Sequence, residues 1–207
     1  MLSPVKPPLR REPQQARSKK VVEKICRATL KVSRTQGLSA LNTNLIAQVA
    51  GVDISSVYRF FPNKDSIIHY ILEQWLGDIR DVWDRFETDP ELLKLPWQAY
   101  FLELSREWQV PGTAEKYSGL AAVWAVYPDL RALDTQHREY FIDFFIRQMK
   151  RFGARGNRRQ WRDLAVYLYV MEDEVHMLAA TGAFSTLKSG RALFLDTMVF
   201  LLGRQLR

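Results

Sequence analysis

The sequence has few of the residues that build a disulfide framework, a metal centre or a membrane span. Its single cysteine, Cys26, excludes an internal disulfide and any cluster of paired cysteine ligands. The three histidines, His69, His137 and His176, are far apart along the chain and give no zinc-binding spacing. No apolar run approaches the roughly 18 residues of a transmembrane helix, and no apolar stretch follows the charged N-terminus as it would in a secretory signal. We therefore expect a cytoplasmic protein that binds no metal or cofactor.

Catalytic motifs are equally scarce. The sequence contains no glycine-rich phosphate loop, no nucleophile motif and no metal-ligand spacing, so we expect it not to be an enzyme. Strict alternation of apolar and polar residues, which would indicate a sheet, is also missing. What remains is a chain of 207 residues, 47% hydrophobic and 26% charged, which is long enough to bury its own core. Helical periodicity along most of this length predicts an all-α fold.

The positive charge is concentrated in the first third of the chain. Residues 1–70 contain 12 basic and 4 acidic residues, whereas residues 71–207 contain 18 basic and 19 acidic residues. A basic segment joined to a neutral body is typical of a module that binds a polyanion. A basic face that is merely solvated is the alternative, and charge alone does not separate the two.

Proline, glycine and capping residues divide the chain into segments. Residues 1–15 contain four of the nine prolines, with Lys6, Arg10 and Arg11 among them, which predicts a flexible basic tail. A DNA-binding domain is expected over residues 16–62 and a larger helical domain over residues 63–207. Helices are expected near residues 16–36, 43–50, 54–60, 64–86, 96–109, 114–126, 129–152, 158–182 and 188–205. Seven basic residues between Arg147 and Arg162 surround a glycine-containing loop and are interpreted as a solvated turn, with a contact to an anionic partner as the alternative.

Residues 43–64, TNLIAQVAGVDISSVYRFFPNK, have the pattern of a helix-turn-helix motif. Asn42 and Asn63 are suited to cap the helices that follow them, and Gly51 allows a sharp turn. Val57 and Phe61 are four residues apart and are expected to attach the second helix to the core. Its opposite face then presents short hydroxyl side chains and an arginine, which are suited to phosphates and base edges.

This motif resembles the DNA-binding region of the TetR family of transcriptional regulators. The matching positions are Ile46, Ala47, Ala50, Gly51, Val52, Tyr58, Phe61, Pro62, Asn63 and Lys64. The sequence departs from the family pattern at Ser33, where a Phe is usual, at Leu41 and Asn42, where two Thr are usual, and at Phe60, where His is frequent. These departures alter local packing and base contacts but retain the motif.

The resemblance implies specific DNA contacts. It implies phosphate contacts from Thr43, Tyr58 and Lys64, and base or groove contacts from Asn44, Ser55, Ser56 and Arg59. Each residue also has a purely structural interpretation: a core aromatic for Tyr58, a solvated lysine for Lys64 and helix-start residues for the two serines. Ile54 and Phe60 are expected either to touch a thymine methyl group or to pack inside the domain.

The resemblance also implies a C-terminal domain that binds a small effector. All six tryptophans lie in this part of the chain, and an aromatic cavity would suit a largely apolar ligand. Core filling is the alternative for each of these residues. Glu172 and His176 share a helix face and would form a polar spot in the pocket, at a dimer interface or on an exposed stripe. The candidate effector residues are Trp75, Ile79, Trp83, Phe101, Trp108, Trp124, Tyr127, Phe145, Tyr169, Glu172 and His176.

Pairing of two chains is expected from the length of the motif and from the resemblance. One short helix covers few base pairs, whereas two such helices a helical turn apart read a palindrome. The last two expected helices are apolar on more than one face, which suits a four-helix bundle across a two-fold axis. We therefore expect a homodimeric repressor that an effector releases from double-stranded DNA. A helical DNA-binding protein without a sensor is the alternative. The sequence does not identify the effector or the operator. It also leaves open whether the protein activates instead of represses, and whether the basic tail contacts DNA.

Overall fold

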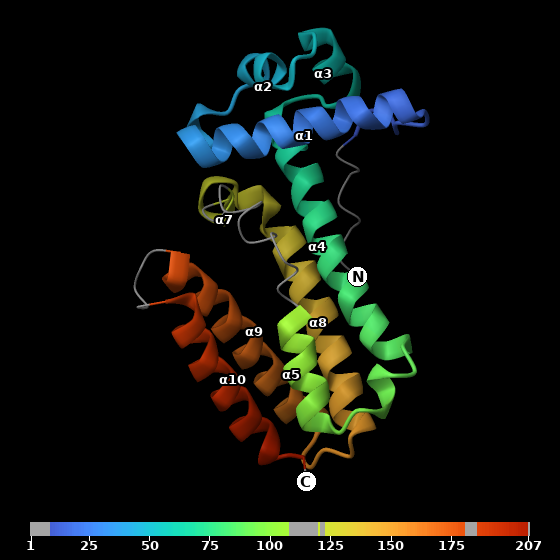
Figure 1. The fold of residues 1–207 in the computed structure, drawn as a ribbon, viewed down its shortest axis with the longest axis vertical. Helices are drawn as coiled ribbons and strands as arrows, with labels where there is room; N and C mark the ends of the chain where they lie inside the picture. Colours follow the sequence, from blue (N-terminus) through green and yellow to red (C-terminus); the bar gives the residue numbers. More distant parts are fainter. Residues whose placement is uncertain (1–8, 108–119, 121–122, 181–185, 207) are drawn as a thin grey trace. The chain divides into compact units, whose positions relative to one another are not determined.

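The computed structural model describes residues 9–107, 120, 123–180 and 186–206, and within these ranges it contains helices and no strand (Figure 1). Three short 3-10 turns, at Leu38–Ala40, Leu92–Lys94 and Pro128–Leu130, connect longer helices. The α-helices are α1 (Ala16–Gln36), α2 (Thr43–Ala50), α3 (Ile54–Phe60), α4 (Lys64–Thr88), α5 (Trp97–Glu107), α7 (Val123–Val126), α8 (Arg131–Arg151), α9 (Arg158–Ala180) and α10 (Leu187–Gly203). The predicted all-α fold is confirmed.

Most helix bounds agree with the sequence periodicity. The bounds predicted for α2 and α3 are those observed, and those of α9 and α10 differ by one or two residues. Asn42 caps α2 as expected, because its side chain accepts a 2.9 Å hydrogen bond from the main-chain N–H of Leu45. Of the helix predicted over residues 114–126, the structure describes only Leu120 and α7, so most of that prediction lies outside the described residues.

The chain forms two compact units. Unit 1 comprises Met1–Gly77 and Val110–Asp134, and unit 2 comprises Asp78–Gln109 and Thr135–Arg207. Helix α4 is continuous from Lys64 to Thr88 and contributes residues to both units (Figure 1). The domain boundary predicted after residue 62 concerns function and independent folding. The division into two compact units does not test these properties, so the boundary stays a prediction.

Unit 1 is built around the apolar stripe of α1. Val22, Ile25 and Val32 lie on this stripe and are at most 4% exposed, while most of the lysines and arginines of α1 are exposed. Helices α2 and α3 both pack against α1. The first turns of α4 add Ile67, Ile68, Ile71, Leu72 and Leu76 to the same core. The result is a small helical head whose core includes the beginning of α4.

Unit 2 has an aromatic core. Trp83 of α4 is fully buried, and its ring centroid lies 4.7 Å from that of His137 and 5.2 Å from that of Phe141, both on α8. Phe101 of α5 packs against Phe145 of α8 at 5.7 Å. Rings at these separations attract each other beyond the effect of area burial. The aromatic richness seen in the sequence therefore fills a core in the described part of unit 2.

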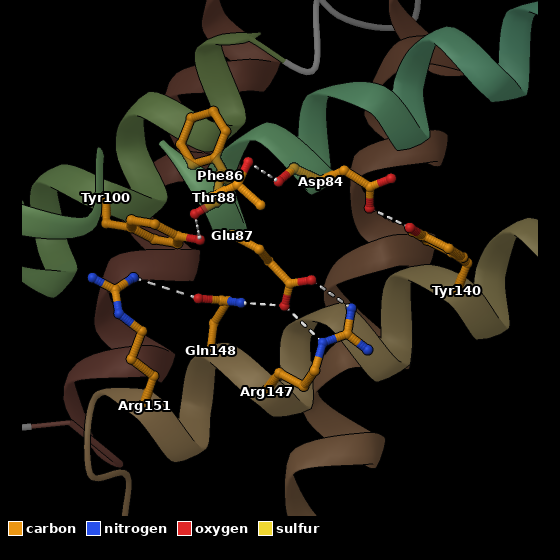
Figure 2. Close-up of polar contacts among 9 residues, drawn as sticks. All are labelled: Asp84, Phe86, Glu87, Thr88, Tyr100, Tyr140, Arg147, Gln148 and Arg151. Carbon is orange, nitrogen blue, oxygen red and sulfur yellow. Dashed lines mark hydrogen bonds and ion pairs between the residues drawn. The ribbon is translucent and has the colours of Figure 1, made fainter. Parts of the chain in front are cut away.

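A polar layer connects the end of α4 to α5 and α8 (Figure 2). Glu87 accepts hydrogen bonds from Arg147 Nε at 2.6 Å and from Arg147 Nη2 at 2.8 Å, and a third from Gln148 Nε2 at 2.8 Å. The hydroxyl of Tyr100 donates to the main-chain carbonyl of Phe86 at 3.0 Å. These bonds join the last turns of α4 to α5 and α8, so they fix the rotation of this part of α4 within unit 2.

The basic segment after α8 is less free than the sequence suggested. Besides the Arg147 pair with Glu87, Arg158 pairs with Asp143 at 2.9 Å and Arg162 pairs with Glu139 at 2.7 Å. The side chains of Arg147, Arg158 and Arg162 are still 50%, 72% and 44% exposed, so these surface pairs are compatible with the interpretation as a solvated turn. Their acidic partners lie on other helices, which a local reading of the sequence cannot detect.

None of the described helices combines the length and the hydropathy needed to cross a lipid bilayer.

Candidate nucleic-acid interface

A left-handed glycine makes the turn between α2 and α3. Gly51 has a φ of 62°, in the region that residues with a Cβ rarely adopt, and the space around it is open. Its main-chain N–H and that of Val52 donate to the last carbonyls of α2, at Gln48 and Ala47, at 3.2 and 3.1 Å. The chain then enters α3 at Ile54. The alanine-glycine pair in the sequence is thus explained by the conformation that this turn requires.

One side of α3 is attached to the core of unit 1. Val57 and Phe61 have no exposed surface, as the spacing predicted. Phe60 is 3% exposed, so of its two expected roles it has the packing one and does not face a thymine methyl group. Two buried side chains on a helix of seven residues, with a third directly after it, fix the rotation of α3, and the opposite side therefore has a defined orientation.

The other side of α3 is open. Tyr58 is 43% exposed and Ile54 is 36% exposed, and Ser55 and Arg59 are also exposed. In the described part of the chain nothing covers this face, so a duplex has access to it. Ser56 is half-buried and has less freedom to reach a base edge.

Two of the residues expected to contact phosphates lie together. The hydroxyl groups of Thr43, at the start of α2, and Tyr58, on α3, are 3.0 Å apart and share a hydrogen bond. Asn44, the next residue along α2, is exposed. The pair places two hydroxyl groups from different helices at one point. While they share their hydrogen bond, one of the two O–H groups is left to donate to a phosphate oxygen.

Lys64, the third expected phosphate contact, begins α4. Asn63 caps this helix: its side-chain oxygen accepts from the main-chain N–H of Ser66 at 2.9 Å and from its hydroxyl at 2.8 Å. The Lys64 side chain is half-buried. All the residues expected to contact DNA therefore lie in unit 1, at α2, α3 and the first residue of α4, and their roles there stay predictions.

One further element at this site, the segment before α1, was not predicted from the sequence. Leu9 is 9% exposed and belongs to the core of unit 1, and the main-chain N–H of Arg10 donates to the carbonyl of Phe60 at 2.8 Å. The surrounding prolines and arginines predicted a flexible tail through residue 15. Leu9 stands between prolines and arginines, and one isolated apolar side chain is too weak a signal to indicate a buried contact.

The candidate effector residues are divided between the two units. Trp75, Trp124 and Tyr127 pack against the core of unit 1. Ile79, Trp83, Phe101, Phe145, Tyr169 and Glu172 belong to unit 2. Trp108 and the side chain of His176 lie outside the described residues. The effector role of each residue stays a prediction.

Glu172 is a buried carboxyl group in unit 2. It is 5% exposed, whereas its neighbours Asp173 and Glu174 on α9 are exposed, so the exposed-stripe interpretation does not hold for it. Ser105 Oγ lies 3.5 Å from Glu172 Oε1, and Arg191 donates to the main-chain carbonyl of Ser105. Burial raises the pKa of Glu172 to about 8, although Arg191 and Ser105 act in the opposite direction. This carboxyl group therefore exchanges a proton near neutral pH.

His137 is the other buried titratable group of unit 2. It is 2% exposed, and burial lowers its pKa to about 3, with a smaller contribution from Arg80. The imidazole is therefore neutral, and its ring stacks within the aromatic core. Among the described residues no group of three or more candidate ligands gathers around a metal position.

One protein-family model matches the part of the chain that carries this interface. Residues 25–71 match the model described as bacterial regulatory proteins, tetR family, a range that includes α2, the turn and α3. A comparison with functionally curated proteins finds no match.

Solved structures with the same fold cover almost the whole chain. A TetR-family transcriptional regulator from Marinobacter aquaeolei VT8 has a TM-score of 0.65 at 16% identity, over 90% of this chain and 91% of that one. A TetR transcription regulator from Haloarcula marismortui ATCC 43049 has a TM-score of 0.64 at 19% identity, over 91% of this chain and 100% of that one. The multidrug binding protein EbrR, solved with imidazole, has a TM-score of 0.56 at 17% identity, over 88% and 95% of the two chains. At these identities the likeness concerns the fold.

Proposed function

We propose that this chain, in which residues 25–71 belong to the tetR family of bacterial regulatory proteins, is a transcriptional repressor. In this proposal it binds a palindromic operator as a homodimer, and a small, largely apolar effector releases it. The observation that carries the proposal is the open face of α3, which presents Ser55, Tyr58 and Arg59 on a helix held by Val57 and Phe61. A rigid helix with one free polar face is what the major groove accommodates.

Arg59 is the residue that tests DNA reading most directly. Its guanidinium lies 5.6 Å from the centroid of the Phe60 ring, and no described ion pair neutralises its charge. If it reads a guanine, Arg59→Ala should weaken specific binding by about 1–3 kcal/mol. The measurement is a gel-shift titration of the full chain with duplex DNA from upstream of its own coding sequence. An unrelated duplex of the same length reports non-specific binding.

Arg159→Ala is the matched control, because Arg159 is exposed on α9 in unit 2 and loses the same charge. Equal losses in both variants would mean that only net charge matters, which contradicts base reading by Arg59. Failure of the wild-type chain to bind any duplex would contradict the proposed function itself.

An apolar surface on the last two helices supports pairing of two chains. Leu193 and Phe200 on α10 are 63% and 65% exposed, and Tyr167 and Val170 on the adjoining α9 are 45% and 47% exposed. Leu193 and Phe200 are seven residues apart, so they lie on the same face of α10. A second copy of unit 2 would cover this surface across a two-fold axis.

The aromatic residues of unit 2 support an effector site. Phe101, Phe145 and Tyr169 belong to the aromatic core of unit 2, and Glu172 is a buried polar group in the same unit. The structural relative EbrR, described as a multidrug binding protein, has the same fold. In our proposal the effector favours a dimer conformation with a different separation of the two α3 helices. The coupling between effector and operator must be reciprocal. The factor by which the effector lowers the affinity for the operator in the gel shift equals the factor by which bound operator lowers the affinity for the effector.

A further inference from the structure

The segment before α1 is attached to the end of the candidate recognition helix. The buried side chain of Leu9 and the hydrogen bond from the Arg10 N–H to the Phe60 carbonyl hold it in place. Phe60 is the last residue of α3, so its carbonyl is one of those that a helix leaves without an internal partner. Residues 9 and 10 therefore cap α3 from outside the helix-turn-helix motif.

The side chains of this segment are available to an external anion. Arg10 and Arg11 are both exposed. Arg10 Nη1 lies 3.5 Å from the carbonyl oxygen of Tyr58, the outer limit of a hydrogen bond, and neither arginine has an ion pair within the described ranges. The acid that follows them, Glu12, lies near Tyr70, whose pKa is raised by burial first and then by Cys26 and Glu12.

We propose that Arg10 and Arg11 form a second DNA-contacting element that binds phosphates beside the groove entered by α3. The inference rests on the proposed DNA binding by α3. Since Arg10 is bonded to the end of α3 that carries Tyr58 and Arg59, its guanidinium approaches the duplex whenever that face does. Duplex DNA carries one charge per roughly 1.7 Å of axis, so phosphates are within reach on either side of the groove. The segment needs no base contact and adds affinity without sequence preference.

The salt dependence of DNA binding tests this element. We compare the wild-type chain with Arg10→Ala/Arg11→Ala, using the upstream duplex and the unrelated duplex described above. The control is Arg155→Ala/Arg159→Ala, which removes two exposed arginines from unit 2. The logarithm of the association constant falls as the logarithm of the salt concentration rises. We expect the magnitude of this negative slope to decrease by about 2 per protomer in Arg10→Ala/Arg11→Ala, equally on both duplexes, and to stay unchanged in the control.

Two further variants separate charge from folding. Arg10→Lys/Arg11→Lys retains both charges and should restore the slope. Leu9→Ala retains both arginines but loses the apolar anchor, and it should lose part of the slope. Arg10→Ala retains the main-chain hydrogen bond to Phe60. Thermal unfolding followed by circular dichroism should therefore give the same melting temperature for Arg10→Ala/Arg11→Ala as for the wild type.

The outcomes distinguish this inference from the function on which it rests. An unchanged slope in Arg10→Ala/Arg11→Ala, while the wild type binds, overturns the second element and leaves the proposed function intact. An equal loss in the control variant overturns it as well, because the effect would then be one of overall charge. A wild-type chain that binds neither duplex overturns both.

Discussion

At the scale of single residues, the buried carboxyl group of Glu172 makes the stability of the folded chain depend on pH. Its pKa of about 8 in the folded chain is well above the ordinary value of 4.5. A carboxyl group with a raised pKa contributes stability that is complete below pH 4.5 and is lost as the pH rises through about 8. Each unit of difference corresponds to about 1.4 kcal/mol.

Glu172→Gln should therefore reduce the pH dependence of folding. We expect the variant to lose less stability than the wild type between about pH 5.5 and about pH 8.5, because the amide never ionises. Urea denaturation at both pH values measures the difference. Glu174→Gln, an exposed residue on the same helix, is the control and should behave as the wild type does. Parallel pH profiles for Glu172→Gln and the wild type would refute the assignment.

Single residues also show where sequence reasoning stops. Val57 and Phe61 were predicted to be buried because their spacing on one helix face is a local property. The burial of Leu9 and the pairing of Arg147 with Glu87 depend on residues about 50 to 60 positions away. Local composition indicated solvent for both, and only the fold brings their partners to them.

At the scale of elements, the turn between α2 and α3 depends on a left-handed residue at position 51. Gly51→Ala would hold a Cβ at a φ of 62°, which costs about 1–2 kcal/mol. We expect a matching loss in thermal stability and a weaker operator complex. Gly203→Ala is the control: Gly203 ends α10, and its added Cβ would meet Trp97 at an ordinary 3.6 Å. The prediction fails if both variants melt at the wild-type temperature.

Elements were the most predictable level of this molecule. Asn42, Gly51 and Asn63 carry signals for helix ends within a few residues, and all three have the expected role. The helix predicted over residues 114–126 ends where α7 ends, at Val126, while most of its length lies outside the described residues. The same signals could not assign the aromatic residues to a pocket or a core, since both require the same side chains.

At the scale of the whole molecule, the exposed apolar surface of α9 and α10 predicts the oligomeric state. Phe200→Glu would place a charge in the proposed contact between two copies, and we expect a monomer where the wild type sediments as a dimer. Analytical ultracentrifugation at matched concentrations measures this. Gln98→Glu, an exposed position on α5, adds the same charge elsewhere and should leave the dimer intact. Identical sedimentation of the two variants would argue for a different contact surface.

The continuity of α4 determines how a minimal DNA-binding fragment can be made. A fragment that stops at residue 62 would lack Ile67, Ile68, Ile71, Leu72 and Leu76, all at most 4% exposed. Burial of each such side chain is worth about 1.5–3 kcal/mol, and together they approach the whole stability of a small domain. Truncation after Gly77 would still remove Leu120, Val123, Leu130 and Leu133 from the same core, so a fragment for crystallography or spectroscopy should retain residues 110–134 as well. A piece without them would expose its own interior and aggregate.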